Sequence, residues 1–247
     1  MIAVVGLIIM LLCPQAWATQ DRSGFAYDQQ LGSQVPLRAP FRDQVGQAVT
    51  LGQAMNGKPT ILALGYFRCP NLCGLVRNDL LNALSRLQGH PDYSVVVLSI
   101  DPEETRQDAS DAQRADDARF VSDARYLTGP ASSISAVAQA VGFRFRRDDT
   151  SKQFLHPSGL VFLTSTGSVS SYLLGLGYQP GDVQLALSRA EQGVVARALP
   201  ILLLCFHYDP TTGRYTLATL RLLQLGAAIT VLVLGGTIVL ALRRERP

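Results

Sequence analysis

Hydrophobic residues in the first half of the chain follow a strand pattern and then a helix pattern. Residues 60–67 form an almost unbroken apolar run, which predicts a buried strand. Residues 93–100 form a second run of this kind, as expected for a strand covered on both faces. Between them, apolar residues recur every three or four positions and predict an amphipathic helix that ends near Gly89; they are Leu72, Leu75, Val76, Leu80, Ala83, Leu84 and Leu87.

A charged helix is expected directly after the second strand. Asp101 can cap it, Pro102 suits the first helical position, and Glu103 and Glu104 put acids in the first turn. This helix is expected to run to about Ser122. The pattern further predicts a short strand at 49–51, a helix at 132–141, a hairpin of strands 160–164 and 169–174, and a helix at 183–192 capped by Asp182.

The order of these elements predicts the fold class. Alternating strands and helices followed by an antiparallel hairpin favour an α/β protein, with a mixed sheet and helices on both faces. Cys69 and Cys73 stand where the strand at 60–67 ends and its helix begins. A dithiol at the carboxyl end of a central strand, opening a helix, is the thioredoxin-like arrangement.

The two cysteines carry the most specific chemistry of the chain. Cys69 and Cys73 are four residues apart, so in a helical turn their thiols share a face. The partial positive charge of a helix N-terminus favours thiolate and predicts low pKa values. The pair therefore suits a thiophilic metal or a disulfide. A purely structural disulfide is the competing interpretation, although such bonds usually close longer loops.

His156 is the candidate third ligand. It lies in the loop 154–159, which leads into the predicted hairpin at the same edge of the sheet as the cysteines. Two thiolates and one imidazole make a good site for Cu(I), and hold Cu(II) with a further oxygen ligand. A structural zinc site would normally have four protein ligands. A loop histidine can also be a plain surface residue, and the sequence alone leaves both interpretations open.

Three residues near these candidate ligands could also act at the site, although the sequence supports their roles less strongly. Asp101 could orient a group of the site, although a helix cap explains it fully. Tyr66 and Arg68 flank the thiols, where they could shape a partner surface, and Arg68 could stabilise a thiolate.

A second cysteine and histidine occur near the end of the chain. Cys205 and His207 are two residues apart, so on an extended strand they share a face and could form an accessory metal site. The simpler interpretation is a short buried strand that ends in a turn at 209–213. His90 is expected to be a structural residue at a helix end.

Three segments of the chain resemble one family. Residues 65–73 (GYFRCPNLC), residues 99–102 (SIDP) and the His156 loop are similar to the Sco/SenC family of copper-binding oxidase assembly proteins. The resemblance covers roughly residues 41–195. It implies a thioredoxin-like fold and copper held by Cys69, Cys73 and His156. It also implies delivery of copper to the copper centre of cytochrome c oxidase, or reduction of the cysteines of that centre.

Both ends of the chain carry apolar segments. Residues 1–18 end in Ala16-Trp17-Ala18 after an apolar core, which predicts a cleavable signal peptide. Residues 222–242 hold no charge and are long enough for a transmembrane helix. The arginines at 243–246 predict a cytoplasmic C-terminus. We therefore expect a single-pass protein of the bacterial inner membrane, with its main domain in the periplasm.

These observations predict six segments along the chain. They are a signal peptide (1–18), an N-terminal arm (19–40), a thioredoxin-like copper-binding domain (41–195), a juxtamembrane extension (196–216), a transmembrane helix (217–242) and a cytoplasmic tail (243–247).

The net charge and the number of cysteines limit the functions that the chain can have. The formal net charge is only +3, and no basic stripe indicates nucleic acid. Without the signal peptide three cysteines are left, an odd number for an oxidising compartment, so at least one thiol needs a role other than an intramolecular disulfide.

We expect a copper chaperone rather than an enzyme. Its expected partners are the copper-centre subunit of an oxidase, another copper chaperone and the membrane. The alternative is a thiol–disulfide reductase that uses Cys69 and Cys73 and needs no histidine.

Overall fold

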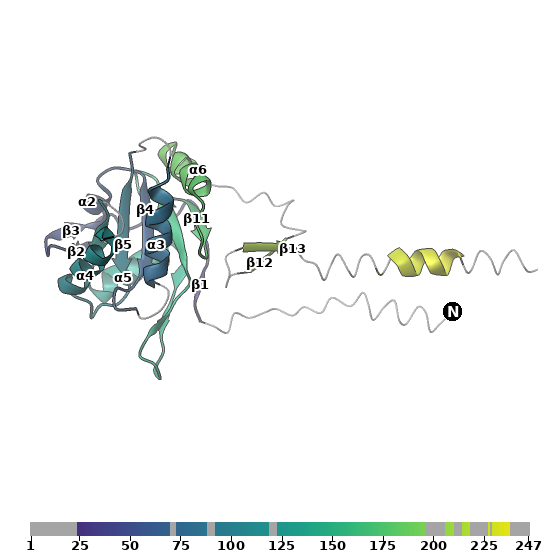
Figure 1. Cartoon of the computed structure of the whole chain (residues 1–247), viewed down its shortest axis with the longest axis horizontal. Coiled ribbons are helices and arrows are strands. Elements are labelled where there is room, and N and C mark those ends of the chain that lie inside the picture. Colours follow the sequence, from purple (N-terminus) through teal and green to yellow (C-terminus); the bar gives the residue numbers. More distant parts are fainter. Residues whose placement is uncertain are drawn as a thin grey trace, which may run out of the picture.

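The computed structural model places most of the chain in one α/β domain (Figure 1). The structure describes residues 24–69, 73–87, 92–118, 123–195, 206–209, 214–217, 227 and 229–237.

A five-stranded mixed sheet forms the centre of the domain. Its strand order is β11 (Val169–Leu174), β10 (Gly159–Leu163), β4 (Thr60–Gly65), β5 (Ser94–Ser99) and β6 (Arg125–Leu127). The last three strands are parallel to one another, whereas β10 runs antiparallel to both β4 and β11. The predicted mixed sheet and the hairpin at its edge are confirmed.

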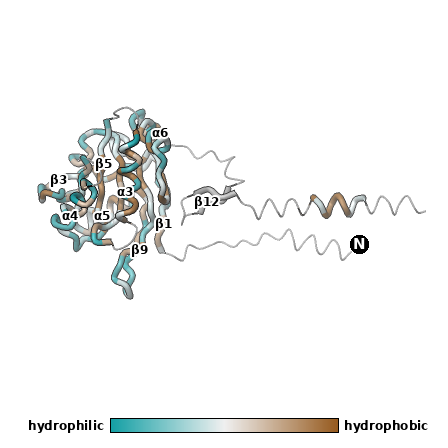
Figure 2. Tube along the Cα trace, viewed as in Figure 1, coloured by the Kyte–Doolittle hydropathy of each residue, from teal (hydrophilic) through white to brown (hydrophobic). Residues whose placement is uncertain are grey.

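Helices cover both faces of this sheet because its strands are apolar on both sides. Alternate residues of a strand point to opposite faces, and on β4 the residue Ile61 joins one buried cluster while Leu62 joins the other. The helices α3 (Cys73–Leu84), α4 (Arg106–Asp117) and α6 (Pro180–Glu191) contribute to the first cluster. The second contains residues of α2 (Leu51–Met55) and α5 (Ala131–Ala140). In Figure 2 the hydrophobic colour runs along β5 and α3 in the interior.

Short strand pairs surround the central sheet. The strands β1 (Ala26–Tyr27) and β7 (Phe143–Arg144) pair antiparallel, as do β2 (Pro40–Arg42) and β3 (Ala48–Thr50). The strands β8 (Arg146–Arg147) and β9 (Phe154–Leu155) form a hairpin that protrudes from the domain and is largely hydrophilic (Figures 1 and 2). From residue 24 onward, the segment expected to be an arm contributes β1 and the buried Val35 to the fold.

Two predicted helix starts are wrong. The helix α4 begins at Arg106 rather than at residue 102, because Thr105 and Asp108 form a capping box. The helix α6 begins at Pro180 after Gln179, so Asp182 lies in its first turn instead of capping it. The strand β6 was not predicted at all, and it completes the parallel part of the sheet.

The apolar ends of the chain lie largely outside the described residues. This applies to residues 1–18 and to most of 217–242, of which residues 229–237 are helical. Among the described residues, none of the helices combines the length and the apolar composition that a membrane crossing needs. Near this end, β12 (Phe206–Asp209) pairs antiparallel with β13 (Arg214–Leu217), which confirms a strand at the predicted place.

Candidate metal centre

The three predicted ligands lie next to the ends of two neighbouring strands, β4 and β10. Cys69 follows β4 and Cys73 is the first residue of α3, whereas His156 lies between β9 and β10. Because β10 runs antiparallel to β4, the end of β4 and the start of β10 meet at one edge of the sheet. Gly65, the last residue of β4, lies against this edge: a Cβ atom on it would be in ordinary van der Waals contact with the Cys73 Sγ at 3.5 Å and the His156 Cε1 at 3.9 Å.

The ligand atoms converge at this edge. The two thiol sulfurs and a ring nitrogen of His156 all lie within 4.8 Å of one another. The Cys73 Sγ is 3.0 Å from the His156 Nε2. Cys73 is buried at 4 % exposure, while Cys69 and His156 are half-buried. Two soft sulfurs and one imidazole nitrogen so arranged suit a thiophilic metal ion that arrives from solvent.

His156 is oriented for ligation. Its Nδ1 lies 3.0 Å from the carbonyl oxygen of Pro157, which can only accept a hydrogen bond, so Nδ1 carries the proton. The lone pair is then on Nε2, the nitrogen that faces Cys73. The rings of Tyr66 and Phe143 lie with their centroids 5.9 Å from the imidazole centroid and restrict its rotation.

The expectation of low pKa values is wrong for Cys73. A hydrogen bond with Cys69, followed by burial, raises the pKa of the Cys73 thiol, and these effects outweigh the helix N-terminus. Burial and a hydrogen bond with Cys69 also raise the pKa of the Tyr66 hydroxyl. Without metal, Cys73 is therefore a buried, protonated thiol at neutral pH.

We expect an alkylating reagent to modify Cys69 before Cys73 in the reduced, metal-free protein. Thiolate is the reactive form, so a raised pKa and 4 % exposure both slow the reaction of Cys73. Its rate should rise with pH, since more of the thiol ionises. Mass spectrometry of peptides after timed iodoacetamide treatment measures both rates. Equal rates at pH 7 would contradict this assignment of the two thiols.

Asp101 does not cap a helix as expected, and Arg68 is paired with carboxylates. Asp101 accepts a hydrogen bond from the Glu103 N–H at 2.9 Å and so caps a turn, not a helix. The Arg68 guanidinium donates to Asp101 at 3.1 Å and lies within 4.0 Å of carboxylate oxygens of Glu104 and Asp108. Arg68 thus faces carboxylates, which accounts for its charge without a thiolate partner.

Glu104 is a residue of this region that the sequence analysis missed. Its buried carboxylate accepts hydrogen bonds from the N–H groups of Phe67 and Arg68, directly before Cys69. Burial raises the pKa of Glu104, and these hydrogen bonds oppose that effect. The sequence did contain a signal for this contact. The loops that follow two neighbouring parallel strands lie side by side, so an acid in one loop can contact the other loop.

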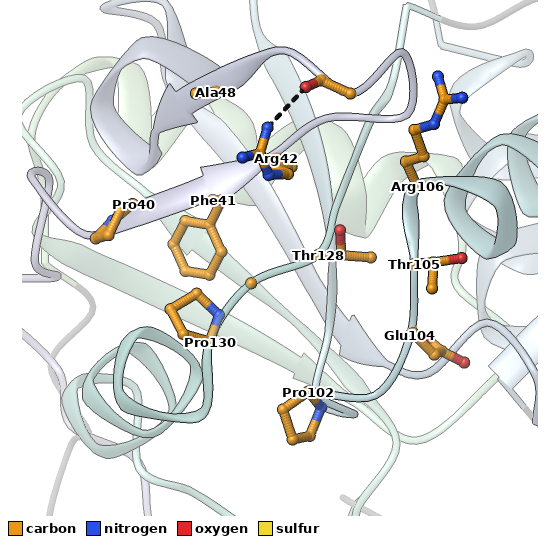
Figure 3. A pocket seen from close by; sticks show the side chains of 12 residues that line it. Pro40, Phe41, Arg42, Ala48, Pro102, Glu104, Thr105, Arg106, Thr128 and Pro130 are labelled. Atoms are coloured by element: carbon orange, nitrogen blue, oxygen red, sulfur yellow. Dashed lines mark hydrogen bonds between the residues drawn. The ribbon is translucent and has the colours of Figure 1, made fainter.

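A separate open hollow of about 620 Å³ lies between the β2–β3 hairpin, the loop after β5 and the start of α5 (Figure 3). Phe41, Pro102 and Pro130 give it an apolar lining, and Arg42 and Arg106 stand at its side. Glu104 also lines it, but neither cysteine nor His156 does, so the hollow is not the place where the three candidate ligands meet.

Other predicted residues stay untested. Pro70, Asn71, Leu72, His90 and Cys205 lie outside the described residues, and the side chain of His207 is not described.

The fold and the site together define a class of protein. A mixed sheet with helices on both faces, and a dithiol where a central strand meets its helix, make this a thioredoxin-like protein. The family model SCO1/SenC matches residues 31–184, and the chain belongs to that family. No curated protein matches the chain in sequence.

Solved structures share this fold. A proposed electron transfer protein from Aquifex aeolicus VF5 is 26% identical, with a TM-score of 0.60 over 66% of this chain and 95% of the other. ScoI from Arabidopsis thaliana, solved with copper bound, is 20% identical with a TM-score of 0.53 over 62% and 96%. BsSco, of the Sco family of cytochrome c oxidase assembly proteins, is 18% identical with a TM-score of 0.53 over 67% and 96%. The latter two likenesses concern the fold.

Proposed function

We propose that this protein is a membrane-anchored copper chaperone that binds copper through Cys69, Cys73 and His156. It delivers the ion to, or prepares, the copper centre of a respiratory haem-copper oxidase. The observation that carries the proposal is the convergence of two sulfurs and one nitrogen within 4.8 Å. Membership of the SCO1/SenC family supports it, as do a fold relative solved with copper and another that belongs to oxidase assembly proteins.

The ligand set favours copper over the common alternatives. Thiolates and imidazole exclude the hard cations magnesium and calcium, which prefer oxygen. Three ligands fall short of the four of a structural zinc site, and a three-coordinate S₂N site suits Cu(I). Copper is here the cargo, so the half-buried Cys69 and His156 serve both binding and release.

We expect the reduced full-length chain to bind one copper ion per molecule. With Cu(II), the thiolate ligands should produce a sulfur-to-copper charge-transfer band in the visible spectrum. Titration of the reduced protein, followed by absorption and metal analysis, measures stoichiometry and ligand type. Oxidation of Cys69 and Cys73 to a disulfide removes both thiolates and should abolish the band. A reduced protein that binds zinc and ignores copper would overturn the proposal.

A thiol–disulfide reductase is the second candidate. It is favoured by the hydrogen bond between Cys69 and Cys73, which places the two sulfurs within reach of a disulfide. The position of His156 against Cys73 favours copper binding instead, because sulfur–sulfur exchange needs no imidazole.

The site is proposed to act on the periplasmic side of the bacterial inner membrane. The uncharged run 222–242 and the arginines that follow it support a single span at 217–242, after a domain at 41–195 and an extension at 196–216. The signal peptide at 1–18 would direct export. Cys205 and His207 are proposed as a minor accessory site beside the membrane.

Reporter fusions test this topology. A periplasm-active reporter should be active when fused after Arg214 and inactive when fused after Pro247, because the proposed span lies between these residues. A cytoplasm-active reporter should give the opposite pattern and serves as the control. Both fusions reporting the same compartment would contradict the span.

A further inference from the structure

One buried carboxylate holds the loop that leads to Cys69. Glu104 is 5 % exposed as a residue, and its side chain is fully covered. Its Oε1 accepts a hydrogen bond from the Arg68 N–H at 2.6 Å, and its Oε2 accepts one from the Phe67 N–H at 2.8 Å. The Ser99 hydroxyl, at the end of β5, donates to Oε2 at 2.6 Å. Two consecutive N–H groups of the loop therefore point at one carboxylate, which is itself tied to β5.

The three proposed ligands differ in how they are held. Cys73 is buried and begins a helix of three turns. His156 is held between the rings of Tyr66 and Phe143 and by its hydrogen bond to Pro157. Cys69 precedes the helix and is only half-buried; its side chain forms hydrogen bonds with Cys73 and Tyr66, and the backbone directly before it sets where that side chain starts. That backbone is the part that Glu104 binds.

We propose that Glu104 is a positioning residue of the metal centre: its carboxylate fixes the 67–68 backbone so that the Cys69 sulfur meets Cys73 and His156. This inference rests on the proposed copper site and extends it to a residue that does not touch the metal. The hydrogen bonds matter more than the ion pair with Arg68, because that guanidinium is 51% exposed and is screened by solvent.

The Glu104→Gln substitution in the full-length chain tests the role of the carboxylate. Glutamine keeps the size of the side chain but replaces one oxygen by an NH₂ group, which cannot accept from an N–H. A donor then faces a buried donor, and the loop must shift to relieve this. We expect copper affinity to fall by about 10- to 100-fold, as is typical when groups behind a metal ligand are lost.

Two readouts report geometry rather than stability. The sulfur-to-copper charge-transfer band should change in position or intensity, since the Cys69 sulfur no longer holds its place. Without metal, the ratio of the alkylation rates of Cys69 and Cys73 should change as well. The second readout needs no copper, so it tests Glu104 even if the wild-type protein fails to bind copper and the proposed function falls.

Asp43→Asn is the matched control. Asp43 is also buried, at 3 % exposure, and its Oδ1 accepts hydrogen bonds from the N–H groups of Val45 and Gln47 at 3.1 and 2.8 Å. It lies in the turn between β2 and β3, and its hydrogen bonds stay within that turn. In Asp43→Asn the amide oxygen can still accept both hydrogen bonds, whereas the buried charge and its approach to Arg125, 4.0 Å from Oδ2, are lost. We expect this variant to lose some stability while keeping the wild-type spectrum, copper affinity and alkylation ratio.

The outcomes separate positioning from a general structural role. A folded Glu104→Gln variant with wild-type values in all three measurements would overturn the proposal, as would equal changes in Asp43→Asn. If Glu104→Gln does not fold, Ser99→Ala leaves Glu104 in place and removes its hydrogen bond from the Ser99 hydroxyl, together with the hydrogen bonds between that hydroxyl and the Asp101 backbone. That variant should shift the same readouts in the same direction by a smaller amount, and wild-type values in it would refute the role of Glu104.

Discussion

Replacing His156 by alanine is expected to weaken Cu(I) binding by more than about 100-fold, because loss of groups that merely support a ligand already costs about 10- to 100-fold. The imidazole Nε2 lies 3.0 Å from the Cys73 sulfur and completes the ligand set. Competition against a coloured Cu(I) chelator measures the affinity.

The same variant should keep its disulfide chemistry. Cys69 and Cys73 retain their positions, so the reduction potential of their disulfide should move by no more than about 30 mV. His90→Ala is the control, since the sequence analysis expects that histidine to be a structural residue at a helix end. If His156→Ala binds copper as tightly as the wild-type protein, the three-ligand site is wrong and the reductase becomes the better function.

The proximity of the three candidate ligands was predictable because each lies at a point where local sequence rules are strong. The apolar run before Cys69 and the helical period after it put the dithiol at a strand–helix junction. The hairpin after His156 then brings that residue to the same edge of the sheet. The long strands were found for the same reason: their residues are buried on both faces and leave a continuous apolar run.

The parts that sequence reasoning missed depend on tertiary contacts or on close competition between local signals. The strand β6 has only three residues and is strand-like only beside β5. Proline and acids after Asp101 favoured an early helix start, but Thr105 provides the better cap through its capping box with Asp108.

Local sequence rules could not predict the electrostatic effects at the site either. The raised pKa of Cys73 follows from its burial and its contact with Cys69, neither of which a helix-terminus argument includes. The sequence placed Glu104 in the first turn of a helix, yet the packing of β4 beside β5 puts its carboxylate against the N–H groups of Phe67 and Arg68.

Removing the carboxylate of Asp116 is expected to cause the largest loss of stability among the substitutions considered. Arg77, one helical turn beyond Cys73 on α3, is buried and donates from Nε to the Asp116 Oδ2 at 2.7 Å. The Tyr126 hydroxyl on β6 donates to the same oxygen at 2.7 Å. One carboxylate on α4 therefore satisfies a buried cation and a buried hydroxyl, and links the helix that begins at Cys73 to the edge of the sheet.

The Asp116→Ala variant leaves the Arg77 guanidinium buried without its carboxylate, and we expect the free energy of unfolding to fall by about 3–5 kcal/mol. Asp111→Ala on the same helix is the control: its ion pair with Arg114 is more than half exposed, so its loss should cost no more than about 1 kcal/mol. Urea unfolding of the reduced, metal-free proteins measures both changes. Replacing Arg77 by Met, Asp116 by Leu and Tyr126 by Phe together should restore much of the lost stability, because neither a charge nor a buried hydroxyl is then left unpaired. A loss below about 1 kcal/mol in Asp116→Ala would show that water reaches Arg77, and that this ion pair does not hold α3 against α4.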